Sequence, residues 1–178
     1  MRRSLLASIC AAIVLNTSAA RADDSIKTAP GVVLKSADGK HDVDLAKLFS
    51  DGPVLVRLTC ACSGCDKELP QFQKLQAAYD AKGLRTVAVF KEKADTAEFY
   101  ANNMHLKCLW LADPKGQSWK VFGATAMPTN ILIDKGGRVV KTVAGCTPDG
   151  KNAQEISAAV AKLLKAEEAK VAETTTKK

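Results

Sequence analysis

Histidine is scarce in this chain of 178 residues, which contains only His41 and His105. The two lie far apart, and neither belongs to a pair spaced for metal binding. The sequence contains one Cys-x-x-Cys motif, Cys62–Cys65, and no second one. Structural zinc takes four ligands, which commonly come as two close pairs. These gaps argue against a zinc site. We expect neither a metal ion nor an organic cofactor, and we expect both histidines to be surface or structural residues.

Aromatic residues make up only 5% of the chain, and no cluster of lysine and arginine is interleaved with them. The 26 basic and 19 acidic residues give a net charge of +7, but the basic residues are dispersed. This pattern argues against nucleic-acid binding. The hydrophobic content of 47% and the charged content of 25% are typical of one soluble globular domain.

The first 22 residues have the features of a secretory signal peptide. Arg2 and Arg3 form a positive start, Leu5–Leu15 is apolar, and Ala20-Arg21-Ala22 offers small residues for cleavage. The apolar stretch is shorter than the ~20 residues of a membrane span, so no stable span is expected. Cleavage is expected after Ala22, with Ala20 as the alternative. Cleavage after Ala22 removes three arginines and no acid, which lowers the net charge from +7 to +4. We therefore expect a periplasmic or otherwise extracytoplasmic protein.

Two cysteines stand between an apolar run and a helix-like stretch. Val54–Leu58 reads as a buried strand, Cys62-Ser63-Gly64-Cys65 follows it, and Asp66–Lys82 has helical spacing of apolar residues. A Cys-x-x-Cys pair between a strand and a helix is typical of a thiol–disulfide redox site. A helix N-terminus also favours the thiolate, which is the nucleophilic form of cysteine.

The segment from Arg57 to Pro70 resembles the active-site segment of TlpA/ResA-type thioredoxin-like proteins, which belong to the redoxin and alkyl-hydroperoxide-reductase superfamily. Gly123–Asp134 resembles the cis-proline segment of that family, and Asp38-Gly39-Lys40 followed by Leu45–Phe49 resembles its N-terminal hairpin and short helix. The resemblance runs from about Gly31 to about Leu164. The chain departs from the family pattern in three ways: Ala61 replaces a tryptophan, Ser63-Gly64 replaces a dipeptide ending in proline, and Cys60 is an additional thiol.

The resemblance implies an α/β thioredoxin-like fold, with a central mixed five-stranded sheet flanked by helices, an N-terminal β-hairpin and an inserted α-β element. The implied spatial order of the strands is 108–111, 84–90, 53–59, 129–134 and 138–143, with the first and last at the two edges. The domain is expected over residues 23–165. Residues 166–178 are expected to form a charged, largely disordered tail whose first part, to about residue 172, could extend the last helix.

Site roles follow from the same resemblance. Cys62 is expected to be the nucleophile and Cys65 the more buried resolving thiol, and the two would form the redox-active disulfide. Glu68 matches the family pattern Cys-x-x-Cys-x-x-Glu and would pass a proton to the resolving thiol. Pro128 would be the cis-proline, and the backbone of Met127 would pair with the extended chain of a partner.

Three more cysteines follow the predicted signal peptide. Cys60 is expected to act as a small buried hydrophobic residue, because neighbours two positions apart rarely form an unstrained disulfide. Cys108 and Cys146 are expected not to bond to each other, because the strand order puts them on opposite edges of the sheet. Cys146 is expected near the dithiol, and Cys108 at the other end of the sheet. Two features of the secondary structure are also predicted: Pro70 kinks the helix that follows Cys65, and Thr147-Pro148 begins the last helix.

The predicted function is that of an exported, monomeric thiol–disulfide oxidoreductase. It would reduce disulfides of exported partner proteins and be recharged by an upstream thiol reductant. One alternative is a thiol peroxidase of the peroxiredoxin type, because Thr59-x-x-Cys62 resembles half of that motif, although Leu55 stands where proline is required. Another is a Sco-like copper-binding or copper-chaperone module using Cys60, Cys62 and Cys65 as soft ligands. The spacing differs from the Sco pattern, and no histidine stands at the required place.

Overall fold

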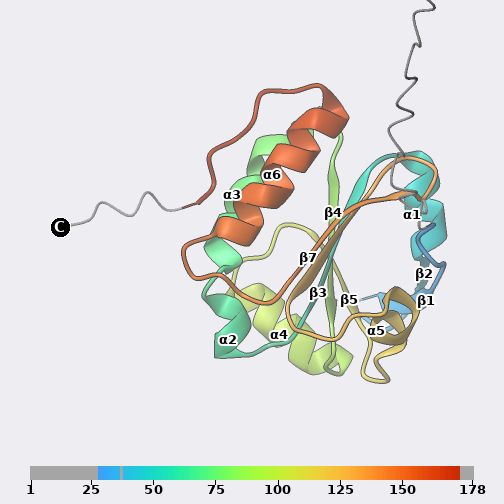
Figure 1. Ribbon diagram of the computed structural model, residues 1–178. Coiled ribbons are helices and arrows are strands. Elements are labelled where there is room, and N and C mark those ends of the chain that lie inside the picture. The colour runs from blue at the N-terminus through green and yellow to red at the C-terminus, as the bar shows by residue number, and fades with distance from the viewer. Residues whose placement is uncertain (1–27, 37, 173–178) are drawn as a thin grey trace, which may run out of the picture.

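The computed structural model describes residues 28–36 and 38–172. The predicted signal peptide, residues 1–22, lies outside the described residues. Within them, the chain forms a mixed seven-stranded sheet with helices on both faces (Figure 1). None of the helices in this part of the chain is long and apolar enough to cross a bilayer. The α/β thioredoxin-like arrangement expected from the sequence is confirmed.

The strands run in the order β2-β1-β5-β4-β3-β6-β7 across the sheet. β3 is central and pairs in parallel with β4 and antiparallel with β6. The bounds of the strands are β1 Val33–Ser36, β2 Asp42–Asp44, β3 Val54–Thr59, β4 Arg85–Phe90, β5 Leu109–Ala112, β6 Thr129–Ile133 and β7 Val139–Ala144. The order expected for the last five is confirmed. The prediction that β5 forms an edge is wrong, because β1 of the hairpin pairs antiparallel with it and extends the sheet to seven strands.

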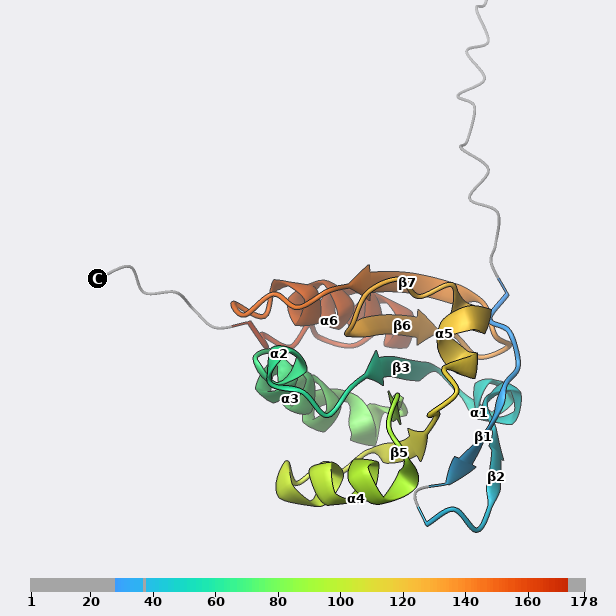
Figure 2. The same ribbon diagram turned by 90° about the horizontal axis from the view of Figure 1, so that it is seen from below.

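The helices cover the two faces of the sheet as separate groups. α3 and α6 lie side by side on one face, and α1 and α5 lie at the opposite face (Figures 1 and 2). The bounds of the helices are α1 Leu45–Asp51, α2 Ser63–Asp66, α3 Leu69–Tyr79, α4 Ala94–Asn103, α5 Gln117–Phe122 and α6 Lys151–Leu164, with a short 3₁₀ turn at Asp80–Lys82. The strand–helix alternation explains why β3, β4 and β5 run parallel.

Both faces of β3 are buried, so the strand is apolar almost throughout instead of alternating. Val54, Val56 and Leu58 pack in the core under α1 and α5. Leu55 points to the other face, into the core under α3 and α6. Arg57 shares that second face and is the only charged residue of the strand. The sheet therefore carries one buried cation on the α3 side.

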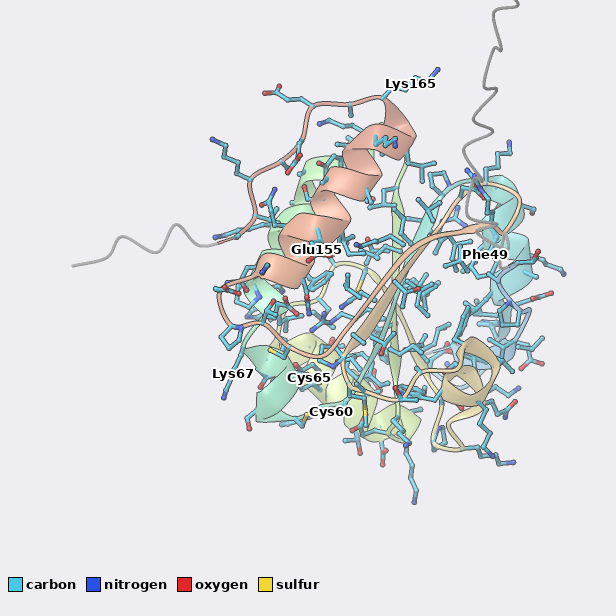
Figure 3. The ribbon with its side chains drawn as sticks, in the orientation of Figure 1. Phe49, Cys60, Cys65, Lys67, Glu155 and Lys165 are labelled. Carbon is cyan, nitrogen blue, oxygen red and sulfur yellow. A yellow bond between two sulfur atoms is a disulfide. The ribbon has the colours of Figure 1, made fainter. Side chains whose placement is uncertain are left out.

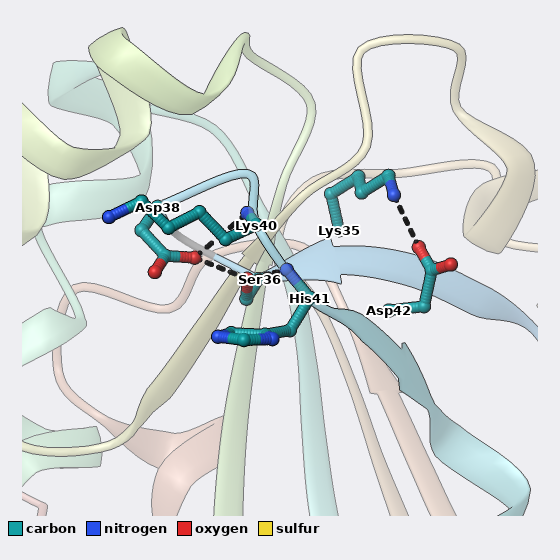
Figure 4. Close-up of polar contacts among 6 residues, drawn as sticks. All are labelled: Lys35, Ser36, Asp38, Lys40, His41 and Asp42. Atoms are coloured by element: carbon teal, nitrogen blue, oxygen red, sulfur yellow. Dashed lines mark hydrogen bonds and ion pairs between the residues drawn. The ribbon is translucent and has the colours of Figure 1, made fainter.

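The N-terminal hairpin turns at Asp38, as the sequence predicts (Figure 4). The Asp38 carboxylate accepts hydrogen bonds from Ser36 Oγ at 2.6 Å and from the Lys40 backbone N–H at 3.0 Å, and these bonds lower the pKa of Asp38. Gly39 has a positive φ of 67°, which the turn requires. His41 is exposed on this hairpin, far from the cysteines in sequence, as expected for a surface residue.

The last helix begins and ends differently from the prediction. α6 begins at Lys151 after Gly150, which has a left-handed φ of 74°, so Thr147 is not its N-cap. The helix ends at Leu164 because Lys165 is also left-handed, which reverses the chain. A helical extension to residue 172 is therefore wrong.

Residues 166–172 run back along α6 and pack against the molecule, so they are not a loose tail. Val171 is 1% exposed. The Gln154 side-chain oxygen accepts hydrogen bonds from the backbone N–H groups of Val171 and Ala172, at 2.8 and 3.2 Å. The Tyr79 hydroxyl accepts another from the Ala169 N–H at 2.8 Å. The domain thus extends beyond residue 165; residues 173–178 lie outside the described residues.

Candidate active site

The Cys-x-x-Cys segment lies at the C-terminal end of β3, at the rim of the sheet. Figure 3 shows Cys60, Cys65 and Lys67 gathered beside α2 at this end of the molecule. β3 ends at Thr59, and Cys62 precedes the single turn of α2 as its N-cap. The Cys62 carbonyl accepts hydrogen bonds from the backbone N–H groups of Cys65 and Asp66, at 3.0 and 3.3 Å. The strand–turn–helix arrangement expected from the sequence is confirmed.

Three cysteines, and not two, converge at this point. Cys62 is exposed, Cys60 is partly buried, and Cys65 is only 3% exposed. Their sulfur atoms all lie within 4.8 Å of one another. The nucleophile and resolving thiol named from the sequence are thus brought together, with a third sulfur between them.

The disulfide in the structure joins Cys60 to Cys62, with 5.4 Å between their Cα atoms, and Cys65 is a free thiol. The sequence predicts a bond between Cys62 and Cys65 instead, with Cys60 only filling space. The pairing differs because the chain bends at Ala61, just after β3, and this bend brings Cys60 and Cys62 within the Cα separation that a disulfide spans. The Cys60 sulfur also lies 3.3 Å from the Cys65 sulfur. Cys60 is therefore part of the sulfur cluster.

The helix after Cys65 is interrupted, where the sequence predicts one kinked helix. α2 ends at Asp66, and α3 begins at Leu69 with Pro70 in its first turn. Proline is tolerated there because the first N–H groups of a helix have no intrahelical partner. The break leaves Glu68 at the junction between the two helices, where its side chain is fully buried.

The Glu68 carboxyl is held by a residue from the other end of the chain. Thr147 Oγ1 donates a hydrogen bond to Glu68 Oε1 at 2.7 Å and accepts one from the Asn152 N–H at 2.8 Å. Glu68 Oε2 has no hydrogen-bond partner among the described residues. Burial raises the pKa of Glu68, while the Thr147 hydrogen bond and the charge of Arg57 oppose this increase. The result is a buried carboxyl that favours its protonated form more than an exposed glutamate does.

Arg57 lies beneath the cysteine turn and is 4% exposed. Its guanidinium donates hydrogen bonds to Asn130 Oδ1 at 2.9 Å and to the Cys65 carbonyl at 3.3 Å, and it stacks 4.3 Å from the centre of the Phe72 ring. Burial lowers the pKa of Arg57, and the charges of Glu68 and Cys65 act in the opposite direction. The buried cation therefore stabilises negative charge at the site.

Two carboxylates hold the cysteine turn from outside. Glu92, just after β4, accepts a hydrogen bond from the Ala61 N–H at 3.1 Å. Asp66 accepts one from the hydroxyl of Tyr100 on α4. Burial and the neighbouring Asp66 raise the pKa of Tyr100, so this hydroxyl stays protonated and remains a donor. These bonds fix the two ends of the segment Ala61–Asp66.

Met127 lines an open groove together with the cysteines, and the next residue, Pro128, is buried behind it. The peptide bond between them is cis, as predicted. The Pro128 carbonyl accepts a hydrogen bond from the Gly145 N–H at 2.8 Å, which ties the start of β6 to the loop after β7. The groove between this loop and the cysteine turn is open to solvent, and its lining residues are Cys60, Cys62, Gly64, Cys65, Lys67, Met127, Cys146 and Pro148.

Cys108 and Cys146 are both free thiols, and Cys146 lines the groove, as predicted. Partial burial raises the pKa of Cys146, and the charge of Glu68 raises it further. Cys108 precedes β5 and borders a second, more enclosed cavity, whose lining also includes Cys65 and Arg57. Burial raises the pKa of Cys108 to about 11. Cys108 is therefore a poor nucleophile at neutral pH.

Four residues of the site have no predicted part in it: Arg57, Thr147, Glu92 and Asn130. The sequence does contain an indication for Arg57, which is the single charged residue in an otherwise apolar strand. A buried strand rarely carries an unpaired cation, so such a residue is expected to have a specific partner. For Thr147 the sequence predicts only the role of a helix cap. Glu92 and Asn130 have no local pattern, since their contacts with Ala61 and Arg57 span 31 and 73 positions in the chain.

The chemistry available here is thiol–disulfide exchange. An exposed sulfur, a buried thiol and a third sulfur lie within 4.8 Å of one another, and a buried guanidinium lies beneath them. Glu68 supplies a proton-carrying group that does not touch bulk water.

Comparison with known proteins agrees with this chemistry. Residues 24–163 match the family Redoxin. The thiol-disulfide oxidoreductase ResA of Bacillus thuringiensis subsp. konkukian (strain 97-27) is 30% identical over 120 residues, covering 67% of this chain and 69% of that protein. ResA of Halalkalibacterium halodurans is 27% identical over 154 residues, covering 82% and 85%.

Among solved structures, a Chlorobium tepidum protein assigned as the thiol:disulfide interchange protein DsbE superposes with a TM-score of 0.70 and 27% identity, covering 79% of this chain and 98% of that one. The family match extends over most of the chain, and it includes the sulfur cluster, the cis-proline and the buried glutamate. The chain therefore belongs to the redoxin family and is a thioredoxin-like thiol–disulfide oxidoreductase.

Proposed function

We propose that this protein is exported and reduces disulfides of exported partner proteins through the dithiol Cys62 and Cys65. The observation that carries the proposal is the contrast between these two cysteines: Cys62 is exposed in an open groove, whereas Cys65 is buried and its carbonyl accepts a hydrogen bond from the Arg57 guanidinium. An exposed thiolate can attack a partner, and a buried thiol can react only with the mixed disulfide that results.

The reaction has two exchange steps. The Cys62 thiolate attacks a partner disulfide, forms a mixed disulfide with one sulfur, and releases the other as a thiolate. Cys65 loses its proton and attacks Cys62, which forms the Cys62–Cys65 bond and releases the second partner sulfur. Glu68 takes up the proton of Cys65 and returns it when the site is reduced again. An upstream thiol reductant supplies the two electrons for the next cycle.

Partner binding is proposed to use the opposite wall of the groove. The backbone of Met127 would pair with an extended segment of the partner, as in strand addition, with its side chain covering the partner's cysteine. The exposed Met127 side chain, 39% accessible, lies on the wall facing Cys62. Pro128 holds this backbone at the groove, and the protein would act as a monomer.

The experiment is a trapping assay with single-cysteine variants. Cys62→Ser is expected to abolish reduction of a protein disulfide such as insulin, and Cys65→Ala is expected to accumulate mixed disulfides with partners. Cys108→Ser serves as the control, because this thiol lies outside the groove, and it should reduce insulin at the wild-type rate. If Cys62→Ala traps partners and Cys65→Ala does not, the two roles are reversed.

A second assay on the same reduced protein, consumption of hydrogen peroxide, distinguishes disulfide reduction from peroxidase activity. Consumption of hydrogen peroxide should be no faster than for Cys62→Ser, because Leu55 is a core residue of β3 where the peroxidase motif requires proline. Export is tested separately, by cell fractionation and by N-terminal sequencing of the mature chain, which should begin at Asp23.

A further inference from the structure

The groove at the cysteine turn is unusually rich in sulfur. Five of its eight lining residues carry sulfur, namely Cys60, Cys62, Cys65, Met127 and Cys146. Disulfide exchange by a dithiol needs two of them. The sulfur atoms of Cys60, Cys62 and Cys65 form the tight group, within 4.8 Å of one another.

The spacing of these three atoms fits one small ion. A metal bound at about 2.3 Å from each of three sulfurs, with the metal in their plane, holds those sulfurs about 4.0 Å apart. The Cys60 and Cys65 sulfurs are 3.3 Å apart, so small rotations of the side chains are sufficient. All three thiols become available once a thiol reductant has opened the Cys60–Cys62 bond, which takes two electrons and two protons.

The surroundings suit an anionic complex. Three thiolates around a monovalent cation carry a net charge of −2. The buried Arg57 guanidinium donates to the Cys65 carbonyl, and Lys67 lines the same groove. Cys65 is buried and Cys60 partly buried, while Cys62 is exposed, so the site is shielded on one side and accessible to an incoming ion on the other.

The type and number of ligands select the ion. Thiolates are soft ligands that favour Cu(I), whereas structural zinc sites complete a tetrahedron with a fourth ligand. Cys146 lines the groove but does not belong to the group within 4.8 Å, and no histidine lines the groove. We propose that the reduced protein binds one Cu(I) ion between Cys60, Cys62 and Cys65. Binding displaces up to three thiol protons and transfers no electrons.

The test measures binding and coordination of Cu(I) alone. Reduced, desalted protein is titrated anaerobically with Cu(I) in competition with bathocuproine disulfonate, and the complex is examined by X-ray absorption. We expect one ion per chain with three sulfur neighbours at about 2.3 Å. Cys60→Ser should bind at least about 100-fold more weakly and show two sulfur neighbours, whereas the matched control Cys108→Ser should keep wild-type affinity and coordination.

Wild-type affinity in Cys60→Ser, with two sulfur neighbours in both proteins, would overturn the proposal, because the Cys62–Cys65 dithiol alone would then account for binding. Four sulfur neighbours that fall to three in Cys146→Ser would also overturn it. Circular dichroism of each variant checks that the fold is intact. The Cu(I) titration does not depend on turnover. Running it and the insulin-reduction assay on one preparation therefore shows separately whether Cu(I) binding fails and whether disulfide reduction fails.

Discussion

Thr147 Oγ1 lies 2.7 Å from Glu68 Oε1, although the two residues are 79 positions apart. The bond joins the loop before α6 to the junction between α2 and α3. The same hydroxyl accepts a hydrogen bond from Asn152 in the first turn of α6. The last helix thereby orients the carboxyl that stands one turn after the buried thiol.

Replacing Glu68 with glutamine tests its role as a proton carrier. Glu68→Gln keeps a hydrogen-bonding side chain of the same size but cannot exchange a proton at neutral pH. We expect the rate of disulfide reduction to fall by about 10- to 100-fold, in the range typical of positioned acid–base groups, with formation of the first mixed disulfide unchanged. Single-turnover measurements separate the two steps. An unchanged resolving step would contradict the assigned role.

The same variant should change how stability depends on pH. Burial raises the pKa of Glu68 above its ordinary value of 4.5, so the folded protein binds this proton more tightly than the unfolded chain. The resulting stabilisation is complete below pH 4.5 and is lost as the pH rises through the raised pKa. The free energy of unfolding of Glu68→Gln relative to wild type should therefore increase over this range, as measured by urea unfolding at several pH values.

Glu155→Gln is the matched control for that measurement. Glu155 is an exposed glutamate on α6 whose pKa is lowered by its hydrogen bond from Lys141. Its contribution has the opposite sign, because it is present above the ordinary pKa and lost as the pH falls. The stability difference between Glu155→Gln and wild type should thus run opposite to that of Glu68→Gln. Parallel curves would show that a general charge effect, and not the buried carboxyl, is responsible.

Replacing Arg57 with methionine removes the buried cation but keeps a long side chain over Phe72. Asn130 Oδ1 and the Cys65 carbonyl each lose a donor, and a buried acceptor without a partner costs about 1–3 kcal/mol. We expect chemical denaturation to show a loss of about 2–3 kcal/mol in unfolding free energy. Arg85→Met on the neighbouring strand is the control. Its ion pair with Asp51 is exposed and 3.5 Å long, so the change should stay within about 0.5 kcal/mol.

The sequence was a sufficient guide where local signals carry the information. The apolar run before Cys62, the turn at Asp38-Gly39 and the family resemblance around Pro128 led to the correct strands, hairpin and cis bond. It was insufficient where a distant contact decides the outcome. Thr147 precedes Pro148 as a helix cap would, but the helix begins only at Lys151, and the Thr147 hydroxyl bridges the Asn152 N–H and the distant Glu68 carboxyl.

The pairing of the cysteines is another feature that depends on contacts the local sequence does not reveal. Sequence spacing favours Cys62 with Cys65, but it does not show that the residue two positions before Cys62 brings a third sulfur within 3.3 Å of Cys65. Similarly, the composition of residues 166–172 predicts a solvated tail. Val171 packs among side chains of α3 and α6. The composition of residues 166–172 alone gives no sign of this contact.

The convergence of three sulfurs predicts that the oxidised protein holds two disulfide isomers. The Cys60 thiolate can attack Cys62 in the Cys62–Cys65 bond and release Cys65, which gives the pairing in this structure. All three cysteines fall in one tryptic peptide, residues 58–67. Alkylation of the free thiol in acid-quenched protein, followed by fragmentation of that peptide, should find label on both Cys60 and Cys65. Label confined to one of them would rule out the exchange.

The Met127 side chain should matter for protein substrates and not for small ones. Met127→Ala removes an exposed apolar contact on the wall facing Cys62. Loss of about 1 kcal/mol of binding raises KM about fivefold, so we expect this increase with insulin and no change with a small aromatic disulfide. Phe99→Ala on α4 is the control, because Phe99 is 70% exposed but does not line the groove. Equal effects of the two substitutions would contradict a specific contact.

The returning segment 166–172 should stabilise the domain through Val171. This side chain is 1% exposed and packs in the core between α3 and α6. Truncation of a buried valine removes two methyl groups and leaves a cavity, so Val171→Ala should lower the free energy of unfolding by about 1–3 kcal/mol. Val121→Ala is the matched control, because Val121 is 43% exposed on α5, and its effect should stay within about 0.5 kcal/mol. Equal urea midpoints for Val171→Ala and wild type would mean that this segment is not docked in solution.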